Sequence, residues 1–224
     1  MYDEKLIKSK ARVQQHGEVF TPHWMVQKML DVPEIKKSCE DIEATFLEPS
    51  AGDGNFLLAI LERKLDAVTT QFNKRYWESK SLIALSSIYG IEFLEDNLEL
   101  ARYRMRIFYL DWYEQKNGEK LNPANKIYKS AKFIIDKNIV RGNTLTKKHP
   151  EYDEWIEFYE WKKVYGSSSK VEPIKFTFAS LFNEEAEVGV VDGQMSFDFL
   201  FDDEPQAKQI EVIDIKEAYK LGEL

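Results

Sequence analysis

The sequence predicts an α/β fold with a mostly parallel sheet and helices on both faces. Short apolar stretches that favour strands alternate with long stretches whose apolar residues recur at helical spacing. The order strand, helix, strand, helix, strand is typical of parallel strands joined by right-handed crossovers. Polar turns rich in glycine, asparagine or acids follow the expected strands. At 224 residues, the chain is long enough for one domain with a substantial core.

Residues 1–20 are expected to form an N-terminal helical arm. The charged stretch 3–15 indicates a helix, and the sequence HGEVFTP at 16–22 breaks it. Thr21 is expected to cap the next helix, PHWMVQKMLDV, through its side-chain oxygen. Pro22 then occupies the first helical position, where its missing N–H costs nothing.

The alternating strands and helices fill most of residues 21–183, the main domain. ATFLE predicts the first strand, and GNFLLAILERKLDAVTTQFNKRYW predicts a long amphipathic helix. LIALSSIYGIEF contains the second strand, which closes at YGIEF. LEDNLELARYRMRIFYLDWYEQKNG is the clearest helix, with apolar residues at helical spacing and a glycine near its end. FIIDKNIVRGNTL supplies the third strand and a turn.

The pattern changes after residue 146. EWIEFYEWKKVYGSSSKVEPIKFTFASLF predicts two strands joined by a serine-rich loop. Residues 184–224 form an acidic tail that we expect to be partly mobile, because it is rich in acids and poor in helix formers. The terminal piece IEVIDIKEAYKLGEL can fold back as a strand and a short helix.

Composition excludes several classes of protein. Cys39 is the single cysteine, so internal disulfides and Cys-rich metal sites are excluded, and a reducing compartment is indicated. The three histidines have no metal-ligand spacing, so we expect no metal. No run approaches the roughly 20 apolar residues of a membrane span. The charged N-terminus lacks the apolar core of a secretion signal, which predicts a cytoplasmic protein without membrane association.

The net charge of −8 is unevenly distributed. Residues 184–224 hold twelve acids and three lysines, whereas the rest of the chain has 28 bases and 27 acids. A nearly neutral body with basic clusters can bind nucleic acid despite overall acidity, so DNA stays a possible partner. These clusters are Lys5/Lys8/Lys10/Arg12, Arg102/Arg104/Arg106 and Lys126/Lys129/Lys132. Solvated helix faces are the alternative interpretation of each cluster.

A glycine turn follows the first expected strand, in EPSAGDGNF. Ligands of open parallel sheets bind beyond the carboxyl ends of the strands, where this turn belongs. Gly52 and Gly54 allow the backbone to approach a ligand closely. Glu48 and Asp53 would repel a phosphate and favour a ligand with positive charge. The dinucleotide pattern G-x-G-x-x-G fails because Leu57 replaces its third glycine, which disfavours an NAD-dependent oxidoreductase.

Two further polar residues follow the second and third strands. Glu92 ends the second strand and can accept hydrogen bonds from both ribose hydroxyls of a nucleoside. Asn143, after the third strand, can hydrogen-bond an adenine edge through its amide. A ribose-binding acid, an adenine-binding amide and an acidic glycine turn together predict a pocket for S-adenosylmethionine (SAM), whose sulfonium and ammonium groups are cationic.

These motifs resemble those of a known family. HGEVFTPHWMVQKML, FLEPSAGDGNFL, YGIEFLEDNLELAR and IVRGNTL are similar to the first four motif regions of bacterial DNA adenine-N6 methyltransferases, over residues 14–146. The similarity is to the branch common in type I and type IIG restriction-modification systems. It implies a Rossmann-like SAM-dependent methyltransferase fold, with restriction-modification or phage origin.

The resemblance also assigns roles to single residues. Thr21 would contact the methionine end of SAM, Glu92 would hold the ribose, and Asn143 would lie beside the adenine. The methionine cradle would comprise Glu48, Ser50, Gly52, Asp53 and Gly54. Asn143 stands where the family more often has Asp, and either side chain can accept from the adenine amino group.

The catalytic motif of that family, Asn/Asp-Pro-Pro-Tyr/Phe, is absent from the sequence. The catalytic residues are therefore unknown, and activity would need a partner chain that supplies the missing pieces. The alternative is a catalytically inactive, methyltransferase-like binding module that acts through a protein or nucleic-acid partner. The aromatic residues Trp155, Tyr159 and Trp161 stand where the motif is expected, and core packing is favoured over base stacking for them.

The tail contains one short motif. GQMSFDFLF, residues 193–201, resembles the glutamine-plus-hydrophobic peptides by which bacterial proteins bind the replication sliding clamp. A sliding clamp is therefore a candidate protein partner. Because such short motifs arise by chance, a terminal strand or a mobile segment is the favoured alternative.

Overall fold

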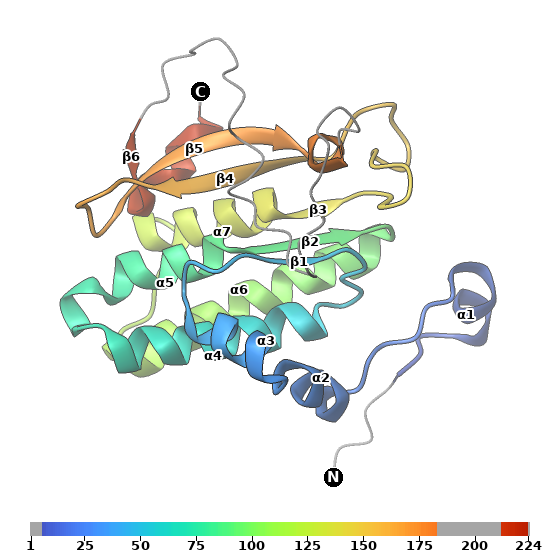
Figure 1. Cartoon of the computed structure of the whole chain (residues 1–224), viewed down its shortest axis with the longest axis horizontal. Coiled ribbons are helices and arrows are strands. Elements are labelled where there is room, and N and C mark those ends of the chain that lie inside the picture. Colours follow the sequence, from blue (N-terminus) through green and yellow to red (C-terminus); the bar gives the residue numbers. More distant parts are fainter. Residues whose placement is uncertain (1–5, 183–211, 224) are drawn as a thin grey trace.

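The computed structural model describes residues 6–182 and 212–223 (Figure 1). Three parallel strands form the central sheet in the order β1-β2-β3, namely β1 (Phe46–Glu48), β2 (Ile88–Glu92) and β3 (Ile139–Arg141). Leu47 lies opposite Tyr89, and Ile91 lies opposite Val140. The predicted α/β class with parallel strands is confirmed, although the sheet is small and its strands are short.

Helices precede and connect these strands. Before the sheet come α1 (Lys10–His16), α2 (His23–Leu30) and α3 (Pro33–Glu40). The first crossover contains α4 (Asn55–Gln71), η1 (Lys74–Tyr76) and α5 (Trp77–Ser86), and the second contains α6 (Glu95–Asn117) and α7 (Lys126–Asn138). Since consecutive strands are neighbours, right-handed crossovers bring the crossover helices to one face of the sheet.

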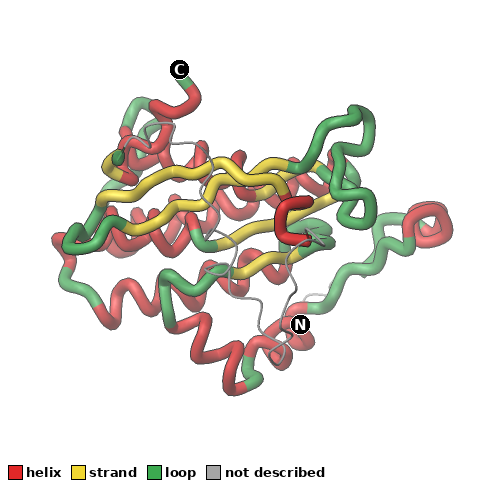
Figure 2. Tube along the Cα trace, turned by 45° about the horizontal axis from the view of Figure 1, so that its top comes forward, coloured by secondary structure: helices red, strands yellow, loops and turns green. Residues whose placement is uncertain are grey.

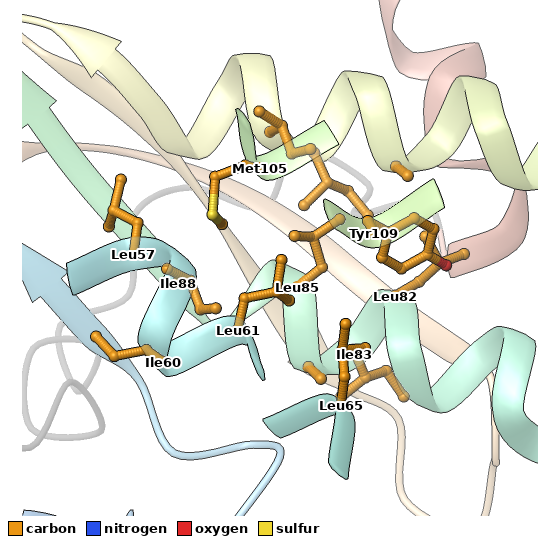
Figure 3. Packing of buried hydrophobic residues seen from close by; sticks show 14 of the residues in the cluster. Leu57, Ile60, Leu61, Leu65, Leu82, Ile83, Leu85, Ile88, Met105 and Tyr109 are labelled. Carbon is orange, nitrogen blue, oxygen red and sulfur yellow. The ribbon is translucent and has the colours of Figure 1, made fainter. Parts of the chain in front are cut away.

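The main hydrophobic core lies between this face and the helices. Figure 3 shows leucines of α4 and α5 pointing toward Met105 and Tyr109 of α6, and Ile88 of β2 joins them. Gly90 of β2 faces the same way, because a Cβ there would meet the Leu57 side chain at 3.1 Å. The sheet and its crossover helices therefore share one continuous core.

The opposite face of the sheet is covered by a hairpin rather than by helices. The hairpin consists of β4 (Glu157–Lys163) and β5 (Lys170–Thr177), which are antiparallel, and η2 (Phe178–Phe182) follows it. A second buried cluster joins Tyr89 and Ile91 of β2 to three phenylalanines and one isoleucine, namely Phe158, Phe176, Phe178 and Ile156. In the described residues, the prediction of helices on both faces is therefore wrong. The strand pair itself is confirmed, and Figure 2 shows its long strands beside the parallel ones.

Three local predictions differ from the structure. The arm helix begins only at Lys10, where Ser9 caps it. Pro22, and not Thr21, occupies the N-cap of α2, without a side-chain cap. The stretch 133–138 belongs to α7, because its buried residues recur at helical spacing from Ile127 onward and Asn125 caps the helix start.

The C-terminal piece folds back as the sequence predicts. Its strand β6 (Ile213–Asp214) pairs with β5, and η4 (Ile215–Gly222) packs on α7. Ser130 of α7 donates a hydrogen bond to the Lys216 carbonyl at 2.9 Å. Most of the predicted acidic tail, together with the motif at 193–201, lies outside the described residues. In the part of the chain that the structure describes, no helix has the length and apolar character for crossing a membrane.

Candidate functional site

The glycine turn lies at the carboxyl ends of the parallel strands. Ala51 donates its N–H to the Ile91 carbonyl at 2.9 Å, which holds the turn after β1 against the end of β2. The Thr144 hydroxyl, after β3, donates to the Pro49 carbonyl. The loop that follows β3 and the N-terminal arm lie at the same end of the molecule (Figures 1 and 2). The segments that follow the three strands thus meet at one edge, as the sequence predicts.

Glu92 forms the centre of this edge. The residue is 6% exposed, and its carboxylate accepts the N–H of Gly52 at 2.7 Å and that of Leu94 at 2.9 Å. The Asn97 amide donates to the same carboxylate at 3.5 Å. Burial raises the pKa of Glu92, the main-chain hydrogen bonds lower it, and the charge of Glu18 adds to the rise. A buried acid at the end of β2 therefore directly contacts the glycine turn after β1.

The two acids of the turn itself differ in their partners. The Glu48 carboxylate accepts the N–H of Ser50 at 3.1 Å, and burial raises its pKa. Asp53 instead forms an ion pair with Arg104 of α6, with 2.7 Å between the charged atoms. Since Arg104 offsets the charge of Asp53, the negative potential expected at this turn depends mainly on Glu48 and Glu92.

Both turn glycines have left-handed backbones that contact protein atoms. Gly52 has φ of 56°, and a Cβ there would lie 3.4 Å from the Phe20 ring. Gly54 has φ of 92°, and its Cβ would lie 3.1 Å from the Ala101 methyl group of α6. Gly54 is also the N-cap of α4 and provides no side-chain cap. The first N–H groups of α4, which have no intrahelical acceptors, therefore point toward this edge without a capping side chain.

The remaining predicted residues flank the turn. The Thr21 carbonyl accepts the Asn55 amide at 3.1 Å, which fixes Thr21 beside the start of α4. The Asn143 side-chain oxygen accepts the N–H groups of Leu145 at 3.0 Å and Thr146 at 3.3 Å. This oxygen is therefore engaged within its own turn, and the expected acceptance of a further hydrogen bond would compete with these two N–H groups.

All eight predicted site residues therefore belong to this edge. These are Thr21, Glu48, Ser50, Gly52, Asp53, Gly54, Glu92 and Asn143. Sequence reasoning missed Glu18 and Phe20 of the arm, and it assigned Arg104 to a possible DNA surface. The only available signal for the first two was their place inside the motif HGEVFTP.

Several cations of the basic clusters bind other groups of the protein. Arg102 donates to the Ile139 and Asp136 carbonyls at 2.8 and 3.0 Å, and Arg104 binds Asp53. Lys8 and Arg12 form ion pairs with Asp96 at the start of α6. These contacts favour a structural role for the cationic groups concerned.

The three aromatic residues at the place where the catalytic motif is expected differ in burial. The Trp161 indole is buried and donates to the Asn138 side chain at 3.1 Å, and Tyr159 packs against the main core. Trp155 is 49% exposed, with Lys148 over its ring. Core packing is therefore confirmed for Trp161 and Tyr159, and Trp155 lies at the surface.

A cavity of about 860 Å³ lies beside β3, between α6 and the loop before β4. Its lining includes none of the eight predicted residues. Arg141 lines it and forms ion pairs with Glu95 and Glu151. Because both arginines of the lining pair with acids of the same lining, the cavity does not indicate a particular ligand.

Neither metals nor known relatives provide a further assignment. Within residues 6–182 and 212–223, no group of three metal-ligating side chains comes together. No family model, curated protein or solved structure matches the chain. The class that the fold defines is an α/β protein with a polar edge at the carboxyl ends of three parallel strands.

Proposed function

We propose that this chain binds SAM at the carboxyl edge of β1, β2 and β3, as a homologue of the DNA adenine-N6 methyltransferases of restriction-modification or phage origin. The observation that carries the proposal is the hydrogen bond between the buried Glu92 carboxylate and the Gly52 N–H. It joins an acid and a glycine turn that are 40 residues apart in the sequence, at the place where nucleoside ligands of parallel sheets bind.

The strand order supports a Rossmann-like interpretation. Doubly wound sheets have the order 3-2-1-4-5-6, and their ligand binds where the order reverses, beside strand 1. The order β1-β2-β3 corresponds to one half of such a sheet. Among the described residues, no strand pairs with the other side of β1. A partner chain that supplies the catalytic motif is part of this proposal.

The chemistry of the described residues fits each part of the cofactor. Glu92 can accept from the ribose, and the uncapped start of α4 can donate to the methionine carboxylate. Glu48 offers negative charge toward the ammonium or sulfonium. Phe20 covers Gly52, so the ligand would lie beside this ring. When bound, SAM supplies a methyl group that is activated by its sulfonium.

SAM is expected to bind the purified full-length protein and to raise its melting temperature. Glu92→Gln should weaken this binding by roughly 1–3 kcal/mol, the cost of a lost hydrogen bond to a charged group. The amide oxygen can still accept main-chain N–H groups, so the fold should persist. Calorimetry with SAM measures both proteins, and Glu62→Gln, an exposed position on α4, is the matched control.

The pH dependence provides a check on the state of Glu92. Burial raises its pKa in the folded protein, so ionisation costs stability as the pH rises above the ordinary value of 4.5. Glu92→Gln does not ionise, so its free energy of unfolding should increase relative to that of the parent protein as the pH rises above 4.5.

The absence of SAM binding in the parent protein would contradict the proposed cofactor. Unchanged affinity in Glu92→Gln would remove this side chain from the site.

A binding module without methyl transfer is the second candidate function. It is favoured by the absence of an Asn-Pro-Pro-Tyr motif, and by the loop and hairpin that follow β3 where that motif is expected. Transfer of tritiated methyl from SAM to mixed DNA by the isolated chain should then stay at background. Labelled adenine would exclude the binding-module interpretation, and labelling only after a partner chain is added would support the first candidate.

A further inference from the structure

Glu18 is a buried acid of the arm that the family motifs do not explain. Its side chain is 6% exposed, and one carboxylate oxygen, Oε2, forms an ion pair with Arg12. The other oxygen, Oε1, is buried and has no hydrogen-bond partner in the described part of the chain. An unpaired buried carboxylate oxygen is costly, so a donor from an ordered water or a bound ligand would stabilise it.

The arm brings Glu18 to the same edge as Glu92. Arg12 binds Glu18 and also Asp96 in the first turn of α6. Lys8 donates to the Asn97 side chain, and Asn97 in turn donates to Glu92. Two residues after Glu18, the Phe20 ring lies against Gly52. The proximity of the two acids agrees with the electrostatic effect of Glu18 on Glu92.

Glu92 does not have the free capacity to bind a ribose by itself. A carboxylate offers about four lone-pair sites, and Glu92 already accepts from Gly52, Leu94 and Asn97. About one site is left, whereas the two hydroxyls of a ribose bring two donors. A second acceptor is needed, and the Oε1 atom of Glu18 is a buried oxygen without a donor.

We propose that Glu18 is the second ribose-binding acid of this site, accepting one hydroxyl through Oε1 while Glu92 accepts the other. The inference rests on the proposed function, because it assumes a nucleoside at this edge. It makes the arm part of the binding site, with Arg12 as the positioning residue that orients the Glu18 carboxylate. Ligands without a ribose diol should therefore bind weakly.

The test is calorimetry of the full chain with S-adenosylhomocysteine and with its 2′-deoxy and 3′-deoxy forms. Glu18→Met removes the acceptor and keeps the length of the side chain. We expect it to bind S-adenosylhomocysteine roughly ten- to hundredfold more weakly than the parent protein does. The parent protein should bind each deoxy form more weakly than S-adenosylhomocysteine. For one of the two deoxy forms, Glu18→Met should show little of this difference in affinity, because the variant no longer binds the hydroxyl that this form lacks.

Three controls separate the possible causes. Arg12→Met breaks the ion pair and leaves Oε1 in the protein, so it should weaken binding less and keep the discrimination. Glu62→Met, at an exposed position, should change neither quantity. Melting temperatures report whether each variant folds, and Glu18→Leu, which also lacks the acceptor, replaces Glu18→Met if the latter does not fold.

The outcomes distinguish this inference from the proposed function. If the parent protein binds neither SAM nor S-adenosylhomocysteine, the proposed function fails and the role of Glu18 fails with it. If the parent protein binds and a folded Glu18 variant has the same affinity, only the role of Glu18 is overturned. Equal weakening toward all three ligands would show that Glu18 acts through the fold, which also overturns the inference.

Discussion

Gly54 illustrates how one backbone angle positions the candidate site. Its φ of 92° belongs to a region that side chains rarely adopt, and Ala101 of α6 lies directly against it. Because glycine has no side chain, α4 and α6 can approach each other closely beside the glycine turn. The sequence suggested that this glycine makes room for a ligand, whereas the structure shows that it makes room for a helix.

Gly54→Ala is expected to destabilise the protein by about 2–4 kcal/mol, because strain at positive φ adds to the clash with Ala101. Gly118→Ala is the matched control, since Gly118 also has positive φ, 81°, but no atom within 4 Å of its would-be Cβ. It should cost about 1 kcal/mol. Urea unfolding measures both variants. Equal losses would show that the contact with Ala101 carries no cost.

At the scale of elements, a buried lysine joins α4 to the segment that leads into β1. The Lys64 ammonium donates to the Asp41 carbonyl at 2.7 Å and to the Ala44 carbonyl at 2.6 Å. Its side chain is fully buried, and burial lowers its pKa to about 8. These bonds satisfy carbonyls that the short approach to β1 leaves without main-chain partners, so the lysine helps to set where the first strand begins.

Lys64→Met should destabilise the protein by roughly 1–3 kcal/mol at pH 7, because two buried carbonyls lose their donor. The pKa of Lys64 is about 8 in the folded protein and ordinarily 10.5, so the parent protein should gain stability as the pH rises between these values. The variant lacks this gain. Unfolding at pH 7 and pH 9.5 measures the difference, with exposed Lys36→Met as the control. A difference that does not change with pH would contradict the lowered pKa.

At the scale of the whole molecule, the parallel sheet lies between a helical layer and an antiparallel hairpin. The alternation of residues in β2 explains this arrangement, because Ile88 and Gly90 face the helices while Tyr89 and Ile91 face the hairpin. The Tyr89 hydroxyl donates to the Tyr159 carbonyl of β4 at 2.9 Å, which joins the two sheets. Both faces are apolar, as in buried parallel strands generally.

The sequence predicted those parts of the fold that depend on local pattern. The helix that ends at Gly118, the hairpin and the carboxyl edge with Glu92 all follow from spacing and turn chemistry. Helices on the second face were predicted wrongly, because the continuous apolar run of β2 is compatible with either kind of cover. The helix at 133–138 was mistaken for a strand, since a short apolar run such as FII does not distinguish the two.

The candidate site was predictable where its residues follow strands, and not where they come from elsewhere. Glu48 and Glu92 end their strands and Asn143 lies two residues after the third, so their common edge follows from parallel topology. The pairing of Asp53 with Arg104 depends on the packing of α4 against α6, so it cannot be predicted from the local sequence. The unpaired oxygen of Glu18 likewise emerges only when the arm lies against α6.

The contact of Arg102 with the Ile139 carbonyl has a consequence for solubility. Within the described residues, β3 is an outer strand of its sheet, and an outer strand can act as a template for a strand from another molecule. A guanidinium bound to this carbonyl occupies an acceptor that an incoming strand would need. One arginine from α6 thereby leaves this edge with one acceptor fewer for a strand of another molecule.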